Sequence, residues 1–312
     1  NITRLRDQTY QTVFHSNQKV SPLSDYSYDA LYRLTDANGR QHPGVNASSL
    51  KQADFIALPS INDGNALESY SETYSYDDSG NLIKKQHQAS SSSWTTETPV
   101  EANSNHLQGL KYDASGNLRQ ASTGSNLDLS FNCCENLVKA TIVQRQNGPD
   151  DSEYYLYDSH EQRTRKVSEL MVKNGTLSHI EDKIYLGNYE LKRNKTLAAD
   201  QQLNISLQRQ TLRVMDGDTC IAIIHSWDID KNQKETQNLN IRKIRYQLDN
   251  HLGSVALELD QQAQLISYEE YFPYGGTAFQ AGKNLIEVAL KTYRYSGKER
   301  DNSTGFYYYG RR

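Results

Sequence analysis

The stretch Tyr74-Ser-Tyr76-Asp77-Asp-Ser-Gly80-Asn81-Leu82 decides the fold, and the chain repeats it at Leu110-Lys-Tyr112-Asp113-Ala-Ser-Gly116-Asn117-Leu118. The alternation x-Tyr-x-Tyr places aromatic rings on one face of a β-strand, because side chains repeat every two residues along a strand. The aspartate then begins a turn, since its carboxylate can accept from the backbone two residues on, and Gly-Asn tolerates positive φ. Leucine resumes the alternation on the returning strand. Each copy therefore predicts one β-hairpin.

Five weaker copies extend this pattern along the chain, and they begin at Tyr26, Phe131, Tyr155, Tyr246 and Leu257. The motif aromatics are unevenly spaced, by 48, 36 and 19 residues over the first four copies. Propeller blades keep a nearly constant period, so the spacing argues against a propeller. Hairpins of unequal length can still join edge to edge. The sequence predicts an all-β ribbon of hairpins with few helices.

One segment departs from the strand pattern. Within residues 279–290, Leu285, Val288 and Ala289 are spaced as on one face of a helix, which predicts a short helix there.

Composition agrees with a polar β-protein. Hydrophobic residues make up 36% of the 312 residues, below the roughly 45–50% apolar usage of globular domains. The chain nevertheless contains 22 Tyr against 6 Phe and 2 Trp, and disordered chains are poor in aromatics. The net charge of −4 is spread along the chain, which argues against nucleic-acid binding. The longest apolar runs fall far short of the ~18 residues that a membrane-spanning helix needs.

Cysteine, histidine and acidic residues give no sign of a metal or cofactor. Cys133, Cys134 and Cys220 match neither a disulfide framework nor a metal-ligand spacing, and we expect them to be buried as small hydrophobic residues. The eight histidines show no metal-binding spacing. The acidic clusters at 150–153 and 269–270 are expected on the solvated surface, because adjacent side chains on a strand point to opposite faces.

Three blocks near the end of the chain carry a resemblance to a known family. They are Asp249-Asn-His-Leu-Gly253-Ser, Glu269-Glu-Tyr-Phe-Pro273-Tyr-Gly-Gly276-Thr, and the run from Arg294-Tyr-Ser-Gly-Lys-Glu-Arg-Asp301 to Gly310. Together with the Tyr-Asp copies they resemble the repeat region and the start of the core of Rhs (YD-repeat) proteins. The finer resemblance is to the C subunit of bacterial insecticidal toxin complexes, the TccC-like proteins. It divides the chain into a repeat region, residues 1–248, and the start of an Rhs-associated core, residues 249–312, which we expect to be incomplete.

The resemblance implies a secreted protein without cofactors that forms part of a hollow β-shell. The shell would be built jointly with a B subunit, would enclose a toxic C-terminal domain, and would dock on a pore-forming A subunit. No nucleic acid and no direct insertion into a membrane is expected. The principal hypothesis is therefore a structural one, in which the chain is wall material of a toxin-encapsulating shell.

Two other functions remain open. In the family the core is an aspartyl autoprotease, for which Asp301 would supply one carboxylate, with Arg294 and Arg300 as supporting residues. The alternative for Asp301 is a turn residue that is ion-paired with one of these arginines. Aspartic proteolysis needs a second carboxylate, and the sequence ends at Arg312 before the expected Asp-Pro motif, so this stretch alone is not expected to be an enzyme. The remaining candidate is a cell-surface or contact-dependent Rhs protein whose Tyr-rich sheet binds carbohydrate or a partner.

Overall fold

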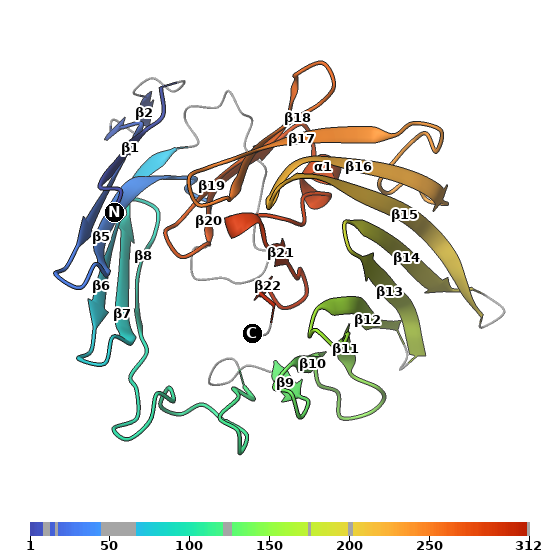
Figure 1. The fold of residues 1–312 in the computed structure, drawn as a ribbon, viewed down its shortest axis with the longest axis horizontal. Coiled ribbons are helices and arrows are strands. Elements are labelled where there is room, and N and C mark those ends of the chain that lie inside the picture. The colour runs from blue at the N-terminus through green and yellow to red at the C-terminus, as the bar shows by residue number, and fades with distance from the viewer. Residues whose placement is uncertain are drawn as a thin grey trace. The chain divides into compact units, whose positions relative to one another are not determined.

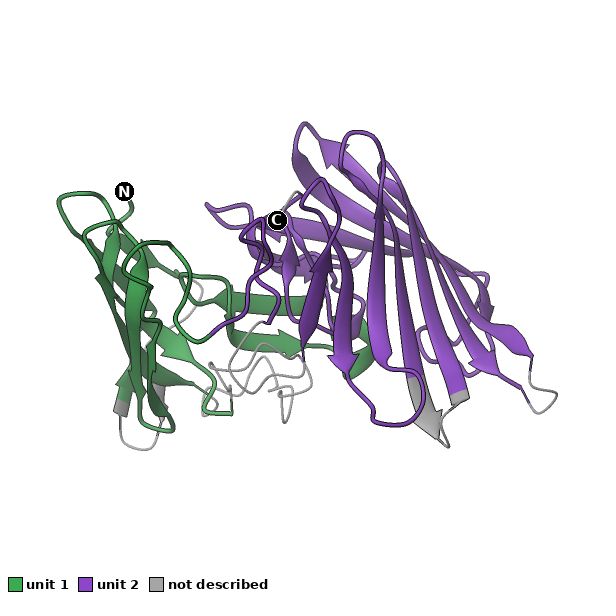
Figure 2. Ribbon diagram, turned by 90° about the horizontal axis from the view of Figure 1, so that it is seen from below, with its two compact units in different colours: residues 1–109, 267–288 green, residues 110–266, 289–312 purple. Residues whose placement is uncertain are grey.

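The computed structural model describes residues 1–8, 13–15, 18–44, 67–120, 127–173, 176–198 and 202–310. The chain divides into two compact units (Figure 2). Unit 1 comprises residues 1–109 and 267–288, and unit 2 comprises residues 110–266 and 289–312. Strands dominate the described residues, in which helical structure is limited to α1 (Leu285–Ala289) and the 3-10 turn η3 (Tyr295–Gly297). The all-β prediction is confirmed. The expected division at residue 249 stays a prediction.

Unit 1 contains a six-stranded antiparallel sheet in the order β1-β4-β5-β6-β7-β8. Val20, Leu67, Phe279 and Ala281 are buried together, and Tyr70 packs edge-on against Phe272 with ring centroids 4.8 Å apart. Residues from both parts of the unit therefore share one core. The strands of unit 1 are β1 (Arg4–Arg6), β2 (Val13–His15), β3 (Gln18–Val20), β4 (Leu23–Tyr28), β5 (Leu34–Gln41), β6 (Glu68–Tyr76), β7 (Leu82–Ala89), β8 (Ser93–Glu97), most of β19 (Leu265–Tyr271) and β20 (Thr277–Gly282).

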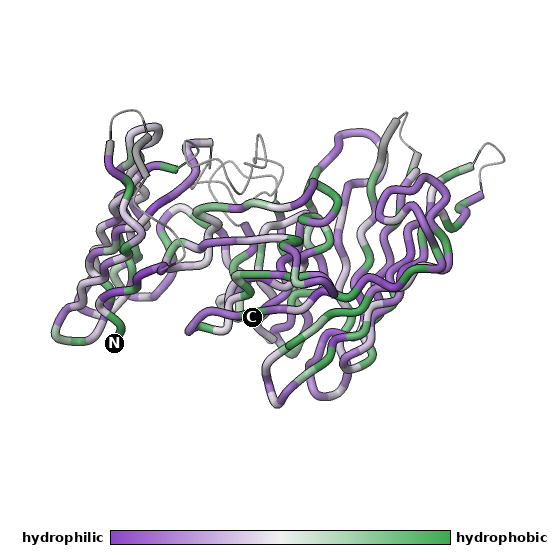
Figure 3. Tube along the Cα trace, turned by 90° about the horizontal axis from the view of Figure 1, so that it is seen from above, coloured by the Kyte–Doolittle hydropathy of each residue, from purple (hydrophilic) through white to green (hydrophobic). Residues whose placement is uncertain are grey.

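Unit 2 is a series of antiparallel hairpins in which each strand from β9 to β18 pairs with its neighbour in the chain (Figure 1). Hydrophilic and hydrophobic residues are interspersed along the chain (Figure 3), in keeping with its polar composition. The strands are β9 (Asp128–Phe131), β10 (Leu137–Val143), β11 (Asp151–Tyr157), β12 (Arg163–Lys173), β13 (Thr176–Leu186), β14 (Tyr189–Leu197), β15 (Leu203–Asp216), β16 (Thr219–Asp230), β17 (Lys243–Asp249), β18 (Val255–Leu259), β21 (Glu299–Arg300) and β22 (Tyr307–Tyr308).

The repeated motif forms the same turn in all seven copies. In the copy at Asp113, the backbone N–H of Asp113 donates to the carbonyl of Asn117, and Gly116 N–H donates back to Asp113. The Asp113 side chain accepts from the backbone N–H groups of Ser115 and Asn117. These donors stabilise the ionised carboxylate and lower the pKa of Asp113. The other turns begin at Asp29, Asp77, Asn132, Asp158, Asn250 and Asp260.

The fourth residue of each turn has positive φ, between 56° at Ala263 and 87° at Gly80. Glycine adopts this conformation without penalty, but four of the copies place Tyr32, Glu135, Glu161 or Ala263 there. The weaker copies therefore keep the turn geometry and accept backbone strain at this position.

Two expectations from the sequence need correction. Cys133 and Cys134 are exposed because they occupy the tip of the turn between β9 and β10, whereas Cys220 is buried as expected. The acidic clusters are not on the solvated surface, since Glu153 and Glu269 are each 1% exposed. Both faces of β11 are covered at this point, since the consecutive residues Asp151, Ser152 and Glu153 are all buried. The predicted short helix is confirmed as α1, which contains Leu285, Val288 and Ala289, and residues 279–282 before it belong to β20.

Candidate functional site

One face of the sheet in unit 2 has four cationic side chains in a single row. Lys166 on β12 lies opposite Lys183 on β13, Lys183 lies opposite Lys192 on β14, and Lys192 lies opposite Arg209 on β15. Like charges directly opposite each other destabilise a sheet. The row therefore requires acidic partners from elsewhere in the chain.

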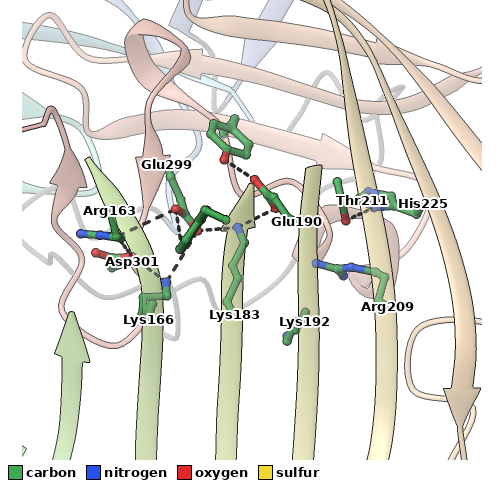
Figure 4. A network of polar contacts seen from close by, with 12 residues as sticks. Arg163, Lys166, Lys183, Glu190, Lys192, Arg209, Thr211, His225, Glu299 and Asp301 are labelled. Carbon is green, nitrogen blue, oxygen red and sulfur yellow. Dashed lines mark hydrogen bonds and ion pairs between the residues drawn. The ribbon is translucent and has the colours of Figure 1, made fainter. Parts of the chain in front are cut away.

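Two of these partners come from the C-terminal segment, which we define as residues 289–310 and which lies against this face (Figure 4). Asp301 accepts from Lys166 at 2.6 Å and from Arg163, at the start of β12, at 3.1 Å. Glu299 accepts from Lys183 Nζ at 2.7 Å and from the Tyr185 hydroxyl at 2.8 Å. Both carboxylates are almost fully buried. The segment thus neutralises the β12 and β13 side of the row.

Two further acids contact the row, one from the sheet and one from the loop after β16. Glu190 lies 2.8 Å from Lys183 and accepts from the Tyr293 hydroxyl of the C-terminal segment. Glu235 accepts from Arg209 at 2.8 Å and lies 3.6 Å from Lys192. Every cation of the row therefore has a carboxylate within 4 Å.

The charges of the network shift the pKa values of Glu299 and Lys166. Burial opposes ionisation of Glu299, but Lys183, Lys166 and Arg163 outweigh it and hold the pKa of Glu299 well below its usual range. Burial likewise disfavours the charged form of Lys166, yet Asp301 and Glu299 raise its pKa above the ordinary value. Both shifts favour the charged forms of Glu299 and Lys166, in keeping with a set of buried ion pairs.

His225 lies on the same face, next to Thr211, whose hydroxyl is 3.0 Å from its Nδ1. The ring is 2% exposed. Burial, together with Arg209, Arg245 and other nearby cations, lowers the pKa of His225 well below its usual value. The histidine is therefore neutral within a cationic environment.

The three residues singled out in the sequence lie in or next to this network. Asp301 is its most deeply buried acid from the C-terminal segment, at 2% exposure. The backbone of Arg294 closes the turn at η3, since Gly297 N–H donates to its carbonyl. Arg300 Nε donates to the carbonyl of Gly305 at 3.4 Å. The catalytic assignment of these residues stays a prediction.

Sequence reasoning missed Arg163 and Lys166, which hold Asp301. They lie 138 and 135 residues before it in the chain. The sequence gives no local signal for them, because residues three apart point to opposite faces of a regular strand. The register shift between β11 and β12 at Arg163–Arg165 allows both side chains to reach Asp301.

The described residues contain no group of three or more His, Cys, Asp or Glu side chains placed to hold a metal ion. No helix in the described part of the chain is long and apolar enough to cross a membrane.

The sequence and the fold of this chain are similar to those of known proteins. No family model matches the sequence. The toxin subunit YenC1 of Yersinia entomophaga is 35% identical over 327 residues, which cover 99% of this chain and 31% of that protein. The toxin subunit YenC2 of the same organism is 33% identical and is matched over 32% of its length. The chain therefore spans about a third of the length of the curated relatives it matches.

Solved structures show the same fold. The crystal structure of TcdB2-TccC3 superposes with a TM-score of 0.84 at 33% identity, over 100% of this chain and 15% of that one. The Tc holotoxin pore of Photorhabdus luminescens, with a mutation in TccC3, gives 0.85 at 34% identity, over 100% and 14%. The chain is homologous to bacterial toxin subunits. Within that class it is similar to the Tc toxin C subunits.

Proposed function

We propose that the chain is part of the C component of a Tc-type toxin complex and forms wall of a shell that sequesters a toxic C-terminal domain. The observation that carries the proposal is the uninterrupted series of antiparallel hairpins in unit 2, whose strand order follows the chain from β9 to β18. Such a series grows by adding hairpins at its edge, which suits it to enclosing a volume. The similarity to YenC1 and to TcdB2-TccC3 supports the toxin role.

The chemistry of the charged face agrees with a wall. Side chains that are paired with one another, such as Arg209 with Glu235 and Arg245 with Glu258, offer little unsatisfied surface to a cargo. Exposed apolar patches would instead bind an unfolded chain. The proposed partners are a B subunit as shell partner, a pore-forming A subunit indirectly, and the enclosed toxic domain. The proposed location is extracellular.

Imaging tests this proposal directly. The full-length protein would be purified with its B subunit and examined by negative-stain microscopy and small-angle scattering. We expect a particle with an internal cavity that becomes filled when the toxic domain is present. A compact solid particle in both cases contradicts the wall function.

A second candidate function is self-cleavage by an aspartyl mechanism. The observation that favours it is the position of Asp301, a buried carboxylate held in place by Arg163 at 3.1 Å and Lys166 at 2.6 Å, because aspartic proteolysis requires carboxylates in a fixed arrangement. The second carboxylate would be the one in the expected Asp-Pro motif after Arg312.

The test is an Asp301→Asn substitution in the full-length protein, with cleavage followed on a gel. Abolished cleavage is the expected result, and undiminished cleavage excludes Asp301. Arg294→Met and Arg300→Met test the proposed supporting residues in the same assay, with Arg165→Met on the opposite face of β12 as the control.

A further inference from the structure

We propose that Arg163, Lys166 and Lys183 form a cationic cradle that recognises Glu299 and Asp301 and fixes the register in which the C-terminal segment lies on the sheet of unit 2. The cradle is built by two neighbouring strands, since Arg163 and Lys166 belong to β12 and Lys183 to β13. The shortest contact of Asp301 is to β12 and that of Glu299 is to β13. This inference is independent of whether the chain encloses a cargo or cleaves itself.

The geometry on the segment matches the cradle. Residues two apart on an extended strand point to the same side, so Glu299 and Asp301 both face the sheet. Asp301 lies 2.6 Å from Lys166 and 3.1 Å from Arg163, and Glu299 lies 2.7 Å from Lys183. Secondary pairs at 3.7 Å and 3.9 Å join Glu299 to Lys166 and Arg163.

The sequence of the segment explains why only one register is stable. The run Lys298-Glu299-Arg300-Asp301 alternates between basic and acidic residues. A slip of one residue exchanges the two faces of a strand, so Lys298 and Arg300 would then point at the cationic cradle. Like charges brought together without solvent are strongly unfavourable, which excludes the slipped register.

In the structure the two basic residues make their contacts elsewhere. Lys298 Nζ lies over the ring of Tyr309, 5.9 Å from its centroid. Arg300 Nε donates to the carbonyl of Gly305. In the observed register the acids Glu299 and Asp301 attract the cationic cradle. In the slipped register Lys298 and Arg300 would face the cradle and be repelled by it.

Register at Glu299 and Asp301 also determines the course of the chain that follows. The backbone N–H of Asp301 donates to the carbonyl of Phe306 at 2.8 Å, and Gly305 N–H donates to the carbonyl of Asp301 at 2.7 Å. This loop returns the chain to β22, where the Tyr308 hydroxyl accepts from the backbone N–H of Arg163 at 2.8 Å. Cradle, loop and β22 are therefore held as one arrangement.

Hydrogen exchange followed by mass spectrometry tests the cradle in the full chain. The double substitution Lys166→Met with Lys183→Met removes cradle charges while keeping aliphatic length. We expect amides of residues 299–308 to exchange about 10-fold faster or more, which corresponds to a loss of roughly 1.4 kcal/mol of docking free energy. Amides of β15 and β16 should keep their protection. Lys183→Arg, which keeps the charge, should restore slow exchange relative to Lys183→Met.

The matched control is Arg165→Met. Arg165 is on the same strand but pairs with Asp182 on the opposite face, at 2.8 Å, and its loss should leave residues 299–308 unchanged. If the double variant loses protection throughout unit 2, the isosteric pair Glu299→Gln with Asp301→Asn decides, because it leaves the sheet side chains intact. Unchanged exchange of 299–308 in that pair, or an equal effect of Arg165→Met, overturns the proposal.

Discussion

The neutral, buried His225 predicts a loss of stability in mildly acidic solution. Its pKa is lowered by burial and by Arg209, Arg245, Lys243 and Lys183, so the folded state does not bind the proton that the unfolded state binds below about pH 6.5. Stability that depends on this histidine is complete above pH 6.5 and is lost as the pH falls below it. Between pH 7 and pH 5 one such group removes up to about 1.9 kcal/mol from the free energy of unfolding, the full value being reached when the folded state binds no proton in this range.

The carboxylates of the network act in a different range. The pKa of Glu299 is held below its usual value. Glu181 on β13 lies 3.7 Å from Lys192, and this lysine lowers its pKa to about 2 against the opposing effect of burial. Their contribution is present above the unfolded value of about 4.5 and is lost only below it. The window from pH 7 to pH 5 therefore reports mainly on His225.

Urea unfolding at a series of pH values measures the effect, with Trp227 fluorescence followed in a Trp94→Phe background so that the signal comes from unit 2. The parent should lose up to about 1.9 kcal/mol between pH 7 and pH 5. His225→Gln should lose much less, because glutamine does not titrate, while His251→Gln at an exposed position should behave as the parent. An equal loss in His225→Gln and parent would refute the reasoning.

Two further outcomes concern the core and the turns. Phe279→Ala removes a ring that is 1% exposed among Val20, Leu67 and Ala281, and should cost about 3–5 kcal/mol in thermal or urea unfolding, with Phe279→Leu clearly milder. Ala263→Gly relieves a left-handed residue with φ of 56° and should gain about 0.5–1 kcal/mol. The reverse change Gly116→Ala should destabilise by a similar amount, and a loss on Ala263→Gly would contradict the strain assigned to that turn.

Local sequence patterns specified most of the fold because their physical causes are local. The alternation Tyr74-Ser-Tyr76 places rings on one face of β6, and Asp77 accepts from Asn81 N–H at 2.8 Å across the turn. These interactions involve residues at most a few positions apart. The copy at Phe131 matches the motif less well, since cysteines replace the usual turn residues. Its turn is held by the Asn132 side chain, which accepts from the backbone N–H groups of Cys134 and Asn136.

The sequence by itself therefore determined the hairpins, their turns and the polar, Tyr-rich character of the sheets. Only the tertiary structure decided which acid meets which cation. Asp301 and Arg163 are 138 residues apart, and Glu299 and Lys183 are 116 apart. Alternation shows that a side chain points to one face of a strand, but a pattern with a period of two residues is the same for every strand. The partner is fixed only when the C-terminal segment lies against β12 and β13.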